Sequence, residues 1–288
     1  MTRGWTSVHG SDAKGSALLP FSNWLEVLSV RGLSGGRNLT LFLDLDGTLA
    51  PIVSDPAKTR VPKGVLETLG QLQNLPRVRI GIISGRSLHK TRELVKVPGL
   101  VRAGNHGLEI EGPGLYFVHP RARKYQGRIA RICRNLEGLL QGYEGVLVEN
   151  KGLSASIHYR CVDRAYHKDI FAAVGLAVAD EVEGIAQSHG KKVIELRPEV
   201  GWNKGTAVLH ILRSFYGPSW QDLTLTLYMG DDETDEDAFL ALKGQGVTVL
   251  VGKPERKTAA AYYLDHFGEV EPALKELLSM VRKSDRPG

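Results

Sequence analysis

Two carboxylates, Asp44 and Asp46, follow a short apolar run and have the spacing of a nucleophile and an acid–base group. Leu41 to Leu43 reads as a buried strand, and Gly47 ends it directly after the second carboxylate. Side chains two residues apart point the same way along a strand, but their directions can diverge where the strand ends. A carboxylate can attack phosphorus to give an aspartyl-phosphate, as in the transport ATPases. A second carboxylate nearby can protonate a leaving alkoxide and later deprotonate water.

Two other positions have the chemistry of a phosphate site. Ser84 and Gly85 follow the apolar run Val78 to Ile83, and their hydroxyl and N–H groups could hold phosphate oxygens. Ser84 could equally be a cap for the next helix. Lys204 opens a helix, the end at which a lysine is not favoured, so we expect it to neutralise phosphate and hold Asp44 in place. Considered alone, a lysine at such a position is more often an exposed surface residue without a functional role.

The densest acidic run, Gly230 to Asp237, follows the apolar stretch Leu223 to Met229. Acidic residues suit the first turn of a helix, which accounts for the later members of the run. That preference does not account for Asp231 and Asp232 at the end of the strand. Their carboxylates suit Mg²⁺, which binds a few protein oxygens together with phosphate and water. Carboxylates brought together here would repel one another severely without a cation.

Alternating strands and helices position these groups. Before residue 119 there are strands at 78–83 and 100–103 and a helix opened by Pro62. The same alternation resumes after residue 199, with a helix from Asn203, a strand at 223–229, a helix from Thr234 and a strand at 246–251. We therefore predict an α/β fold whose core is a doubly wound, mostly parallel, Rossmann-like sheet formed by residues 38–118 and 199–288.

The alternation changes in residues 119–198. The pattern there predicts a helix at Arg121 to Leu140, strands at Glu144 to Glu149 and Leu153 to Tyr159, a helix at Arg164 to Gln187 and a strand at Lys192 to Arg197. Strands joined by short links indicate an antiparallel sheet, hence an inserted α+β cap domain. Residues 1–37 are expected to be a loose leader of unknown role, with one short helix near Phe21 to Val30.

The strands of this insert carry polar residues at alternate positions. Glu149 and Lys151 are two apart, as are His158 and Arg160, and Glu195 and Arg197, so each pair projects from one face. The apolar residues between them, such as Ile157 and Ile194, would face the helices. The polar face could then meet the hydroxyl groups of a ligand, or it could simply be solvated.

These motifs, in this order, resemble those of the haloacid dehalogenase superfamily and, within it, the trehalose-6-phosphate phosphatases. The resemblance covers roughly residues 40–280. Its strings are 43–52 (LDLDGTLAPI), 84–86 (SGR), 104–109 (GNHGLE), 148–151 (VENK), 158–160 (HYR), 195–198 (ELRP), 203–205 (NKG) and 230–239 (GDDETDEDAF). The last string is the most specific, and the strings of the insert separate this family from more general sugar phosphatases.

The resemblance implies Mg²⁺-dependent hydrolysis of trehalose 6-phosphate to trehalose and phosphate. It implies catalytic roles for Asp44, Asp46 and Lys204, and metal binding by Asp44, Asp46, Asp231, Asp232 and Asp235. The substrate-binding residues that it implies are Thr48, Ser84, Gly85, Arg86, His106, Glu149, Lys151, Arg160 and Glu195. A phosphatase of another sugar phosphate, such as mannosyl-3-phosphoglycerate, a phosphosugar mutase and a catalytically silent sugar-phosphate sensor remain the alternatives.

Composition narrows the class of protein. The 288 residues are 42% hydrophobic and 24% charged, and no apolar run is long enough to span a membrane. The two cysteines have no metal-like or redox-like spacing, and the polar segment Met1 to Gly15 does not resemble a signal peptide, so we expect a cytoplasmic protein. The net charge of +5 suits an anionic small molecule, but the basic residues are too dispersed to favour nucleic acid. We expect a monomer.

Overall fold

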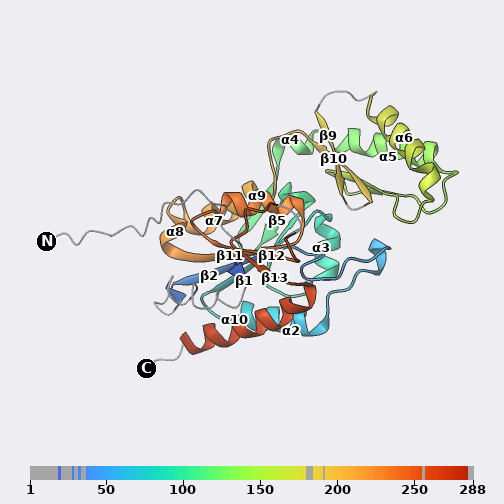
Figure 1. The fold of residues 1–288 in the computed structure, drawn as a ribbon. Coiled ribbons are helices and arrows are strands. Elements are labelled where there is room, and N and C mark those ends of the chain that lie inside the picture. Colours follow the sequence, from blue (N-terminus) through green and yellow to red (C-terminus); the bar gives the residue numbers. More distant parts are fainter. Residues whose placement is uncertain are drawn as a thin grey trace.

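The computed structural model describes residues 19–20, 28, 32–33, 37–179, 184–190, 192–254 and 257–284. These residues form two sheets, a nine-stranded one and a four-stranded one, each with its own helices (Figure 1). The part built on the nine-stranded sheet is called the large unit below, and the part built on the four-stranded sheet the small unit. The short helix expected near Phe21 to Val30 falls, except for Leu28, outside the described residues.

The large sheet has the order β1-β13-β12-β11-β2-β3-β4-β5-β6. Its strands are β1 (Leu19–Pro20), β2 (Asn38–Leu43), β3 (Val78–Ile83), β4 (Val101–Gly104), β5 (Glu109–Gly112), β6 (Leu115–Val118), β11 (Thr224–Gly230), β12 (Val247–Val251) and β13 (Tyr262–Leu264). All neighbours from β1 to β4 are parallel, and only β5 and β6 are antiparallel. The expected doubly wound, mostly parallel sheet is therefore confirmed.

Helices cover both faces of this sheet (Figure 1). Helices α2 (Lys63–Gln73) and α10 (Val270–Ser284) lie on one face. Helices α7 (Lys204–Tyr216), α8 (Trp220–Leu223) and α9 (Glu233–Ala241) lie on the other, and the short α3 (Leu88–Leu94) packs beside β4. Parallel strands have to be covered in this way because their backbone and both their faces are buried.

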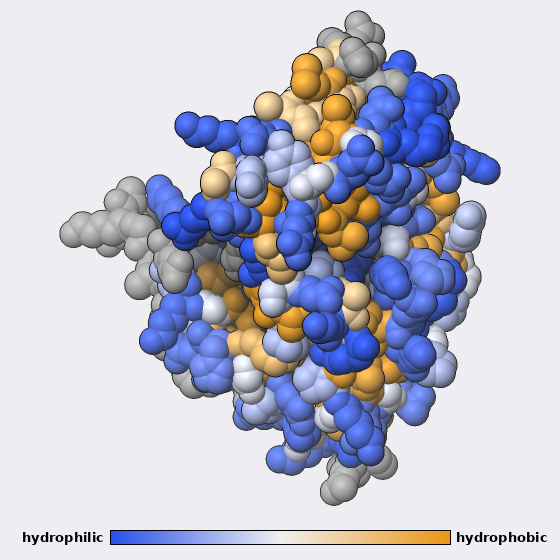
Figure 2. All heavy atoms as spheres, turned by 90° about the vertical axis from the view of Figure 1, so that its right-hand side faces the viewer, coloured by the Kyte–Doolittle hydropathy of each residue, from blue (hydrophilic) through white to orange (hydrophobic). Residues whose placement is uncertain are grey.

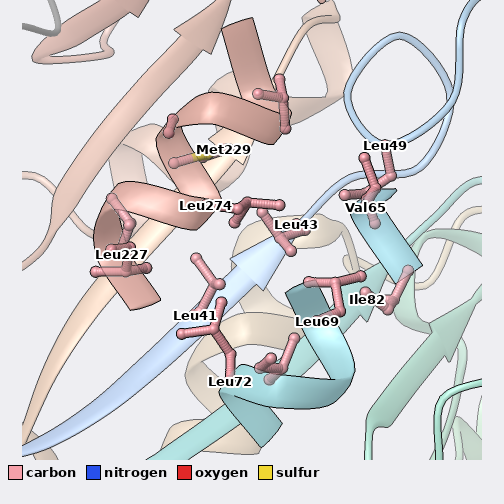
Figure 3. Packing of buried hydrophobic residues seen from close by; sticks show 14 of the residues in the cluster. Leu41, Leu43, Leu49, Val65, Leu69, Leu72, Ile82, Leu227, Met229 and Leu274 are labelled. Atoms are coloured by element: carbon pink, nitrogen blue, oxygen red, sulfur yellow. The ribbon is translucent and has the colours of Figure 1, made fainter. Parts of the chain in front are cut away.

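Strand β2 lies in the centre of the sheet and is apolar on both faces. Leu41 and Leu43 point toward α2 and α10, where they meet Leu69 and Leu274 in one buried cluster (Figure 3). Phe42 points to the opposite face and joins the cluster of α7 and α9. Each fully buried side chain of this size contributes about 1.5–3 kcal/mol to folding, so the strand that carries Asp44 at its end is firmly fixed.

The small unit has a four-stranded antiparallel sheet in the order β7-β8-β10-β9. Its elements are α4 (Pro120–Arg123), α5 (Gln126–Leu140), β7 (Leu147–Asn150), β8 (Ala155–His158), α6 (His167–Ala179), β9 (Ile185–Gly190) and β10 (Val193–Pro198). Helices α5 and α6 pack on one face of the sheet, where Ile157, Ile194 and Leu196 are fully buried. The expected apolar and polar faces of this sheet are thus separated by the alternation along its strands.

Two expected helices of the small unit differ from the structure. The stretch 121–140 forms two helices, α4 and α5, with the interruption at Lys124 and Tyr125. The expected helix from Arg164 to Gln187 was wrong at its C-terminal end, because Ile185–Gly190 forms the edge strand β9; α6 is described as far as Ala179. Strand β9 pairs with β10 over six residues, and this tertiary pairing decides the conformation of a polar segment without clear periodicity.

The described residues before β2 belong to the large unit. Strand β1 pairs with β13 at the edge of the sheet, and Leu28 and Leu33 lie in the cluster under β2. The sequence pattern did not predict these contacts.

The surface is mixed in character. On the face shown in Figure 2, hydrophilic and hydrophobic side chains are interspersed over both units. Within the described ranges, no helix is both long enough and apolar enough to cross a membrane.

Candidate active site

The carboxyl ends of four adjacent parallel strands meet at one edge of the large sheet. Strands β11, β2, β3 and β4 are neighbours in that order, so the residues that follow them come together. Asp44 follows β2, Ser84 follows β3, Asn105 follows β4, and Asp231 follows β11. Open α/β sheets bind ligands at this edge.

Asp44 is fixed by a buried lysine. Lys204 Nζ lies 2.7 Å from Asp44 Oδ1 and 2.8 Å from Asp235 Oδ1, and all three side chains are at most 6% exposed. Tyr228 Oη donates a hydrogen bond of 2.6 Å to the same oxygen of Asp235. The expectation that Lys204 lies against Asp44 agrees with this geometry.

The pKa values in this cluster reflect burial and charge together. Burial raises the pKa of Asp44 well above its usual value; Lys204 opposes that rise, while Asp235 and Asp231 add to it. Burial alone would lower the pKa of Lys204, but the carboxylates of Asp235 and Asp44 hold it above its usual value. Lys204 therefore stays charged, and this charge favours the ionised form of Asp44 that a nucleophile requires.

Three carboxylates form a group of the kind that binds a divalent cation. Oxygens of Asp44, Asp231 and Asp235 all lie within 4.8 Å of one another. Gly47 allows the approach of Asp231: a Cβ there would stand 2.1 Å from Asp231 Oδ2, and the φ of +88° suits glycine. A Cβ on Gly230 would likewise come 2.2 Å from Asp235 Cγ. Hard carboxylate oxygens in this number fit Mg²⁺.

The other two residues of the expected metal set have different surroundings. Asp232 is the N-cap of α9: its side chain accepts a hydrogen bond from Glu233 N in a capping box with Asp235. The Asp46 carboxylate forms an ion pair with Arg86, at 2.7 Å from both Nε and Nη2. The side chain of Asp46 is directed to this guanidinium.

Ser84 and Thr48 are buried beside the cavity instead of lining it. Ser84 is 1% exposed, and its Oγ accepts a hydrogen bond from Arg86 N at 3.1 Å. It does not cap α3, whose N-cap is Ser87. Thr48 is fully buried, and its Oγ has no hydrogen-bond partner among the described residues. Gly85 and Arg86 do line the cavity.

A cavity of about 900 Å³ lies between the two units. From the large unit it is lined by Asp44, Asp46, Gly85, Arg86, His106, Lys204, Asp231 and Asp232. From the small unit it is lined by Glu149, Lys151, Arg160 and Glu195. Its volume is in the range of small-molecule sites, and charged side chains from both units converge on it.

The polar face of the small sheet supplies a connected group of side chains. Lys151 Nζ lies 3.1 Å from Glu195 Oε1 and donates a hydrogen bond of 2.9 Å to the carbonyl of Gly85 in the large unit. Ser156 Oγ donates to Glu195 Oε1 at 2.5 Å. Glu149 pairs with His158 at 3.1 Å. Burial alone would raise the pKa of Glu149, but the hydrogen bond from His158 and the charge of Lys151 hold it below its usual value.

His106 is the only histidine among the expected substrate-binding residues. It is 7% exposed, and neither ring nitrogen has a hydrogen-bond partner among the described residues. Burial lowers the pKa of His106 well below its usual value, and the positive charges of Arg197, Lys204 and Lys151 lower it further. A neutral imidazole here can donate one hydrogen bond and accept one at the cavity wall.

Comparison with known proteins agrees with these observations. The sequence profile of the trehalose-phosphatase family matches residues 42–267. The chain belongs to this family. It is 36% identical to "Probable trehalose-phosphate phosphatase D" of Arabidopsis thaliana over 88% of this chain and 70% of that protein. It is 33% identical to "Trehalose-phosphate phosphatase B" of the same plant, over 97% of this chain and 77% of that one.

The fold is also that of solved family structures. The C-terminal domain of the C. albicans trehalose-6-phosphate phosphatase superposes with a TM-score of 0.73 at 24% identity, over 92% of this chain and 99% of that one. The family match confirms the resemblance drawn from the sequence strings, and the structural likeness confirms the fold class.

The structure adds residues that the sequence pattern did not identify in this member of the family. Tyr228 binds Asp235 from inside β11, where a tyrosine looks like an ordinary core residue. Thr59 accepts a hydrogen bond of 2.7 Å from Arg86 across a loop. Ser156 lies opposite Glu195 in the pairing of β8 with β10. The alternation along β8 could have identified Ser156, because its neighbours Ala155 and Ile157 are buried on the helix side.

Proposed function

We propose that this chain hydrolyses trehalose 6-phosphate to trehalose and inorganic phosphate. The observation that carries the proposal is that one cavity holds Asp44 and Lys204 on the large unit and Glu149, Lys151 and Glu195 on the small unit. The first set has the chemistry to attack phosphorus, and the second has the chemistry to bind sugar hydroxyls. Membership of the trehalose-phosphatase family supports the choice of sugar.

Asp44 is the nucleophile in this proposal. One of its carboxylate oxygens attacks phosphorus, the bond from phosphorus to the sugar oxygen breaks, and an aspartyl-phosphate forms on Asp44. Asp46 gives a proton to the departing sugar oxygen. In the second step, Asp46 takes a proton from water as the water oxygen attacks phosphorus, and this step releases phosphate and restores Asp44. Lys204 holds Asp44 in position through the contact of 2.7 Å.

The acidic group would bind Mg²⁺. Asp44, Asp231 and the backbone carbonyl of Asp46 would hold the ion, with Asp235 close enough to contribute. When bound, Mg²⁺ supplies positive charge that offsets the negative charge of the phosphoryl oxygens and of the carboxylates. Asp232 belongs to this proposed set through its place at the cavity wall, although its side chain caps α9.

Phosphate and sugar are proposed to be bound by different units. Thr48, Ser84, Gly85, Arg86 and His106 belong to the phosphate end. Of these, Gly85, Arg86 and His106 line the cavity. Glu149, Lys151, Arg160 and Glu195 belong to the sugar end and line the cavity from the small unit. Every phosphatase of this kind must bind phosphate, so selection of trehalose has to come from the second group.

We propose further that the small unit, residues 119–198, acts as a cap over a core formed by residues 38–118 and 199–288. The chain crosses between the units near residues 119 and 198, where Pro120 and Pro198 stand. Transfer of the phosphoryl group to Asp44 should occur with water excluded, whereas hydrolysis of the resulting aspartyl-phosphate needs water. Opening and closing about these crossings would meet both requirements. We also propose that the protein is a cytoplasmic monomer. Size-exclusion chromatography with light scattering would measure its oligomeric state.

A panel of phosphorylated sugars tests the proposed function. Phosphate release is measured for trehalose 6-phosphate, glucose 6-phosphate, sucrose 6-phosphate and mannosyl-3-phosphoglycerate at equal concentrations with Mg²⁺. We expect the highest kcat/KM for trehalose 6-phosphate. Preference for another member of the panel would reassign the substrate. No turnover of any member, with binding of trehalose 6-phosphate retained, would indicate a sensor.

A further inference from the structure

Asn105 joins the two units through hydrogen bonds buried beside the cavity. It follows β4 in the large unit, is fully buried, and has a φ of +51°. His106 and Gly107 follow it with φ of +57° and +90°, so three consecutive residues have left-handed backbone conformations. Asparagine is among the few non-glycine residues that adopt this region readily. The turn directs the Asn105 side chain away from the large sheet and toward the small unit.

Each group of the Asn105 amide has a partner. Its Oδ1 accepts a hydrogen bond from Ser154 Oγ, and Ser154 is a fully buried residue of the small unit. Its Nδ2 donates to the backbone carbonyl of Lys151 at 3.1 Å and to Glu109 Oε1 at 2.7 Å. The same Glu109 oxygen accepts from Leu88 N at 2.9 Å, at the start of α3. The Asn105 side chain is therefore bonded once to the large unit and twice to the small unit.

Lys151 is held at both ends by this arrangement. Its carbonyl is bound by Asn105, and its Nζ binds Gly85 O and Glu195. The turn formed by residues 151–154 is closed by a hydrogen bond of 3.0 Å from Lys151 N to Ser154 O. The backbone N–H groups of Asn105 and His106 in turn donate to Arg86 O and Ser84 O at 2.7 and 2.9 Å. One asparagine thus links the loop at residues 84–86 to the turn at residues 151–154.

We propose that Asn105 is a positioning residue that fixes Lys151, and through it Glu195, at the sugar end of the cavity. The Asn105–Ser154–Lys151 joint connects the units at a place distinct from the two chain crossings near 119 and 198. It keeps the turn at 151–154 in register with the loop at 84–86 while the rest of the small unit moves. This inference rests on the proposed sugar phosphatase activity, because its consequence is discrimination between a sugar phosphate and a smaller phosphate ester.

Two variants remove the joint from opposite sides. Asn105→Gly removes the amide and its three hydrogen bonds but keeps the left-handed turn, which glycine adopts without strain. Ser154→Ala removes one hydroxyl on the small unit and leaves the large unit unchanged. The matched control is Thr68→Ala, which removes a buried hydroxyl that bonds only to Gly64 O within α2, on the other side of the large unit.

The expected result is a loss that depends on the substrate. Ser154→Ala should lower kcat/KM for trehalose 6-phosphate roughly 2- to 10-fold, and Asn105→Gly by at least about 10-fold. Both should leave kcat/KM for p-nitrophenyl phosphate within about twofold, since that ester does not reach the small unit. The double variant should be no worse than Asn105→Gly alone, because both changes break the same joint. The control should change neither substrate.

Hydrogen exchange gives a readout independent of the substrate. Backbone amides of residues 150–154 should exchange faster in both variants than in the wild type. In the control variant their exchange rates should equal those of the wild type. If the wild type prefers another sugar phosphate, the proposed function fails, but the joint is still tested by that substrate and by exchange. Equal losses on both substrates would make Asn105 a support of the phosphate loop and overturn the inference. Unchanged selectivity with unchanged exchange would overturn it too. Should Asn105→Gly fail to fold, Ser154→Ala decides alone.

Discussion

Arg86 holds both carboxylate oxygens of Asp46, with Nε and Nη2 each 2.7 Å from an oxygen. The same guanidinium donates to Thr59 Oγ1 at 2.7 Å and to Pro56 O at 3.2 Å. Burial alone would lower the pKa of Arg86, but the hydrogen bonds and charge of Asp46 raise it. The pair fixes the orientation of the Asp46 carboxylate, the proposed acid–base group.

The first prediction concerns the nucleophile. Asp44→Asn keeps the shape of the side chain but removes the charge that attacks phosphorus, so phosphate release should fall about 10⁴-fold or more for every ester. Asp46→Asn should slow both half-reactions, because the side chain can then neither protonate the leaving oxygen nor deprotonate the attacking water. The exposed Asp222→Asn in α8 is the matched control and should keep wild-type activity. Near-normal turnover by Asp44→Asn, in a preparation free of other phosphatases, would contradict the assignment.

The second prediction concerns the metal. Three carboxylates within 4.8 Å repel one another, so a divalent cation should support both activity and stability. EDTA should silence phosphate release, and Mg²⁺ should restore it. Thermal unfolding followed by circular dichroism should show a higher Tm with Mg²⁺ than with EDTA, and Asp231→Asn should reduce that difference. Full activity after exhaustive chelation would rule out the proposed metal.

The third prediction concerns selection of the sugar. Glu149 lines the cavity from the small sheet, and its only hydrogen bond described here is with His158. A hydrogen bond to a charged group contributes about 1.5–3 kcal/mol, so Glu149→Ala should lower kcat/KM for trehalose 6-phosphate roughly 10- to 200-fold. Hydrolysis of p-nitrophenyl phosphate should hardly change. Glu137→Ala, on the outer side of α5, is the control.

Equal losses on both substrates in Glu149→Ala would mean that Glu149 supports the fold of the small unit and does not read the sugar. Lys151→Ala should show the same selective loss for trehalose 6-phosphate.

The fourth prediction concerns motion of the cap. Small-angle X-ray scattering with and without a non-hydrolysable trehalose phosphate analogue should show a smaller radius of gyration for the complex. Closure about residues near 119 and 198 is the physical reason, since it would exclude water while the phosphoryl group is transferred to Asp44. Inorganic phosphate alone is the control ligand, because it cannot bridge the two units. Identical scattering profiles would contradict the lid.

The sequence was sufficient for the elements whose residues carry their own local signal. Strand β2 is apolar on both faces and is followed by two carboxylates, so both its burial and the place of Asp44 at the carboxyl ends of the strands could be predicted. Strand β9 could not, because only its pairing with β10 makes the polar segment Ile185–Gly190 a strand.

The same distinction holds in the site. Lys204 lies close to Asp44 because strand β2 ends and helix α7 begins at the same edge of the sheet, and the sequence predicted this proximity. The pair of Arg86 with Asp46 and the bonds of Asn105 to Lys151 and Ser154 depend on how loops from different strands meet. Contacts between such loops leave no periodic pattern in the sequence, so they could not be predicted.

The last prediction concerns the dependence of stability on pH. Burial and the nearby positive charges hold the pKa of His106 well below its usual value. The folded protein therefore keeps this ring neutral at a pH where the unfolded chain, with a pKa of about 6.5, binds a proton. Because the unfolded state then binds more protons, the free energy of unfolding must fall as the pH falls below about 6.5, by at most about 1.4 kcal/mol per pH unit.

His106→Asn isolates this contribution. Asparagine tolerates the φ of +57° at this position and does not titrate, so the variant should lose less stability on acidification. Urea unfolding at pH 7.5 and 5.5 should show a drop in the wild type that exceeds the drop in the variant by as much as about 1.4 kcal/mol, the other groups cancelling in the comparison. The exposed His89→Asn in α3 is the control and should behave as the wild type. Parallel losses in wild type and His106→Asn would mean that His106 takes up a proton equally well in the folded protein, contrary to its burial.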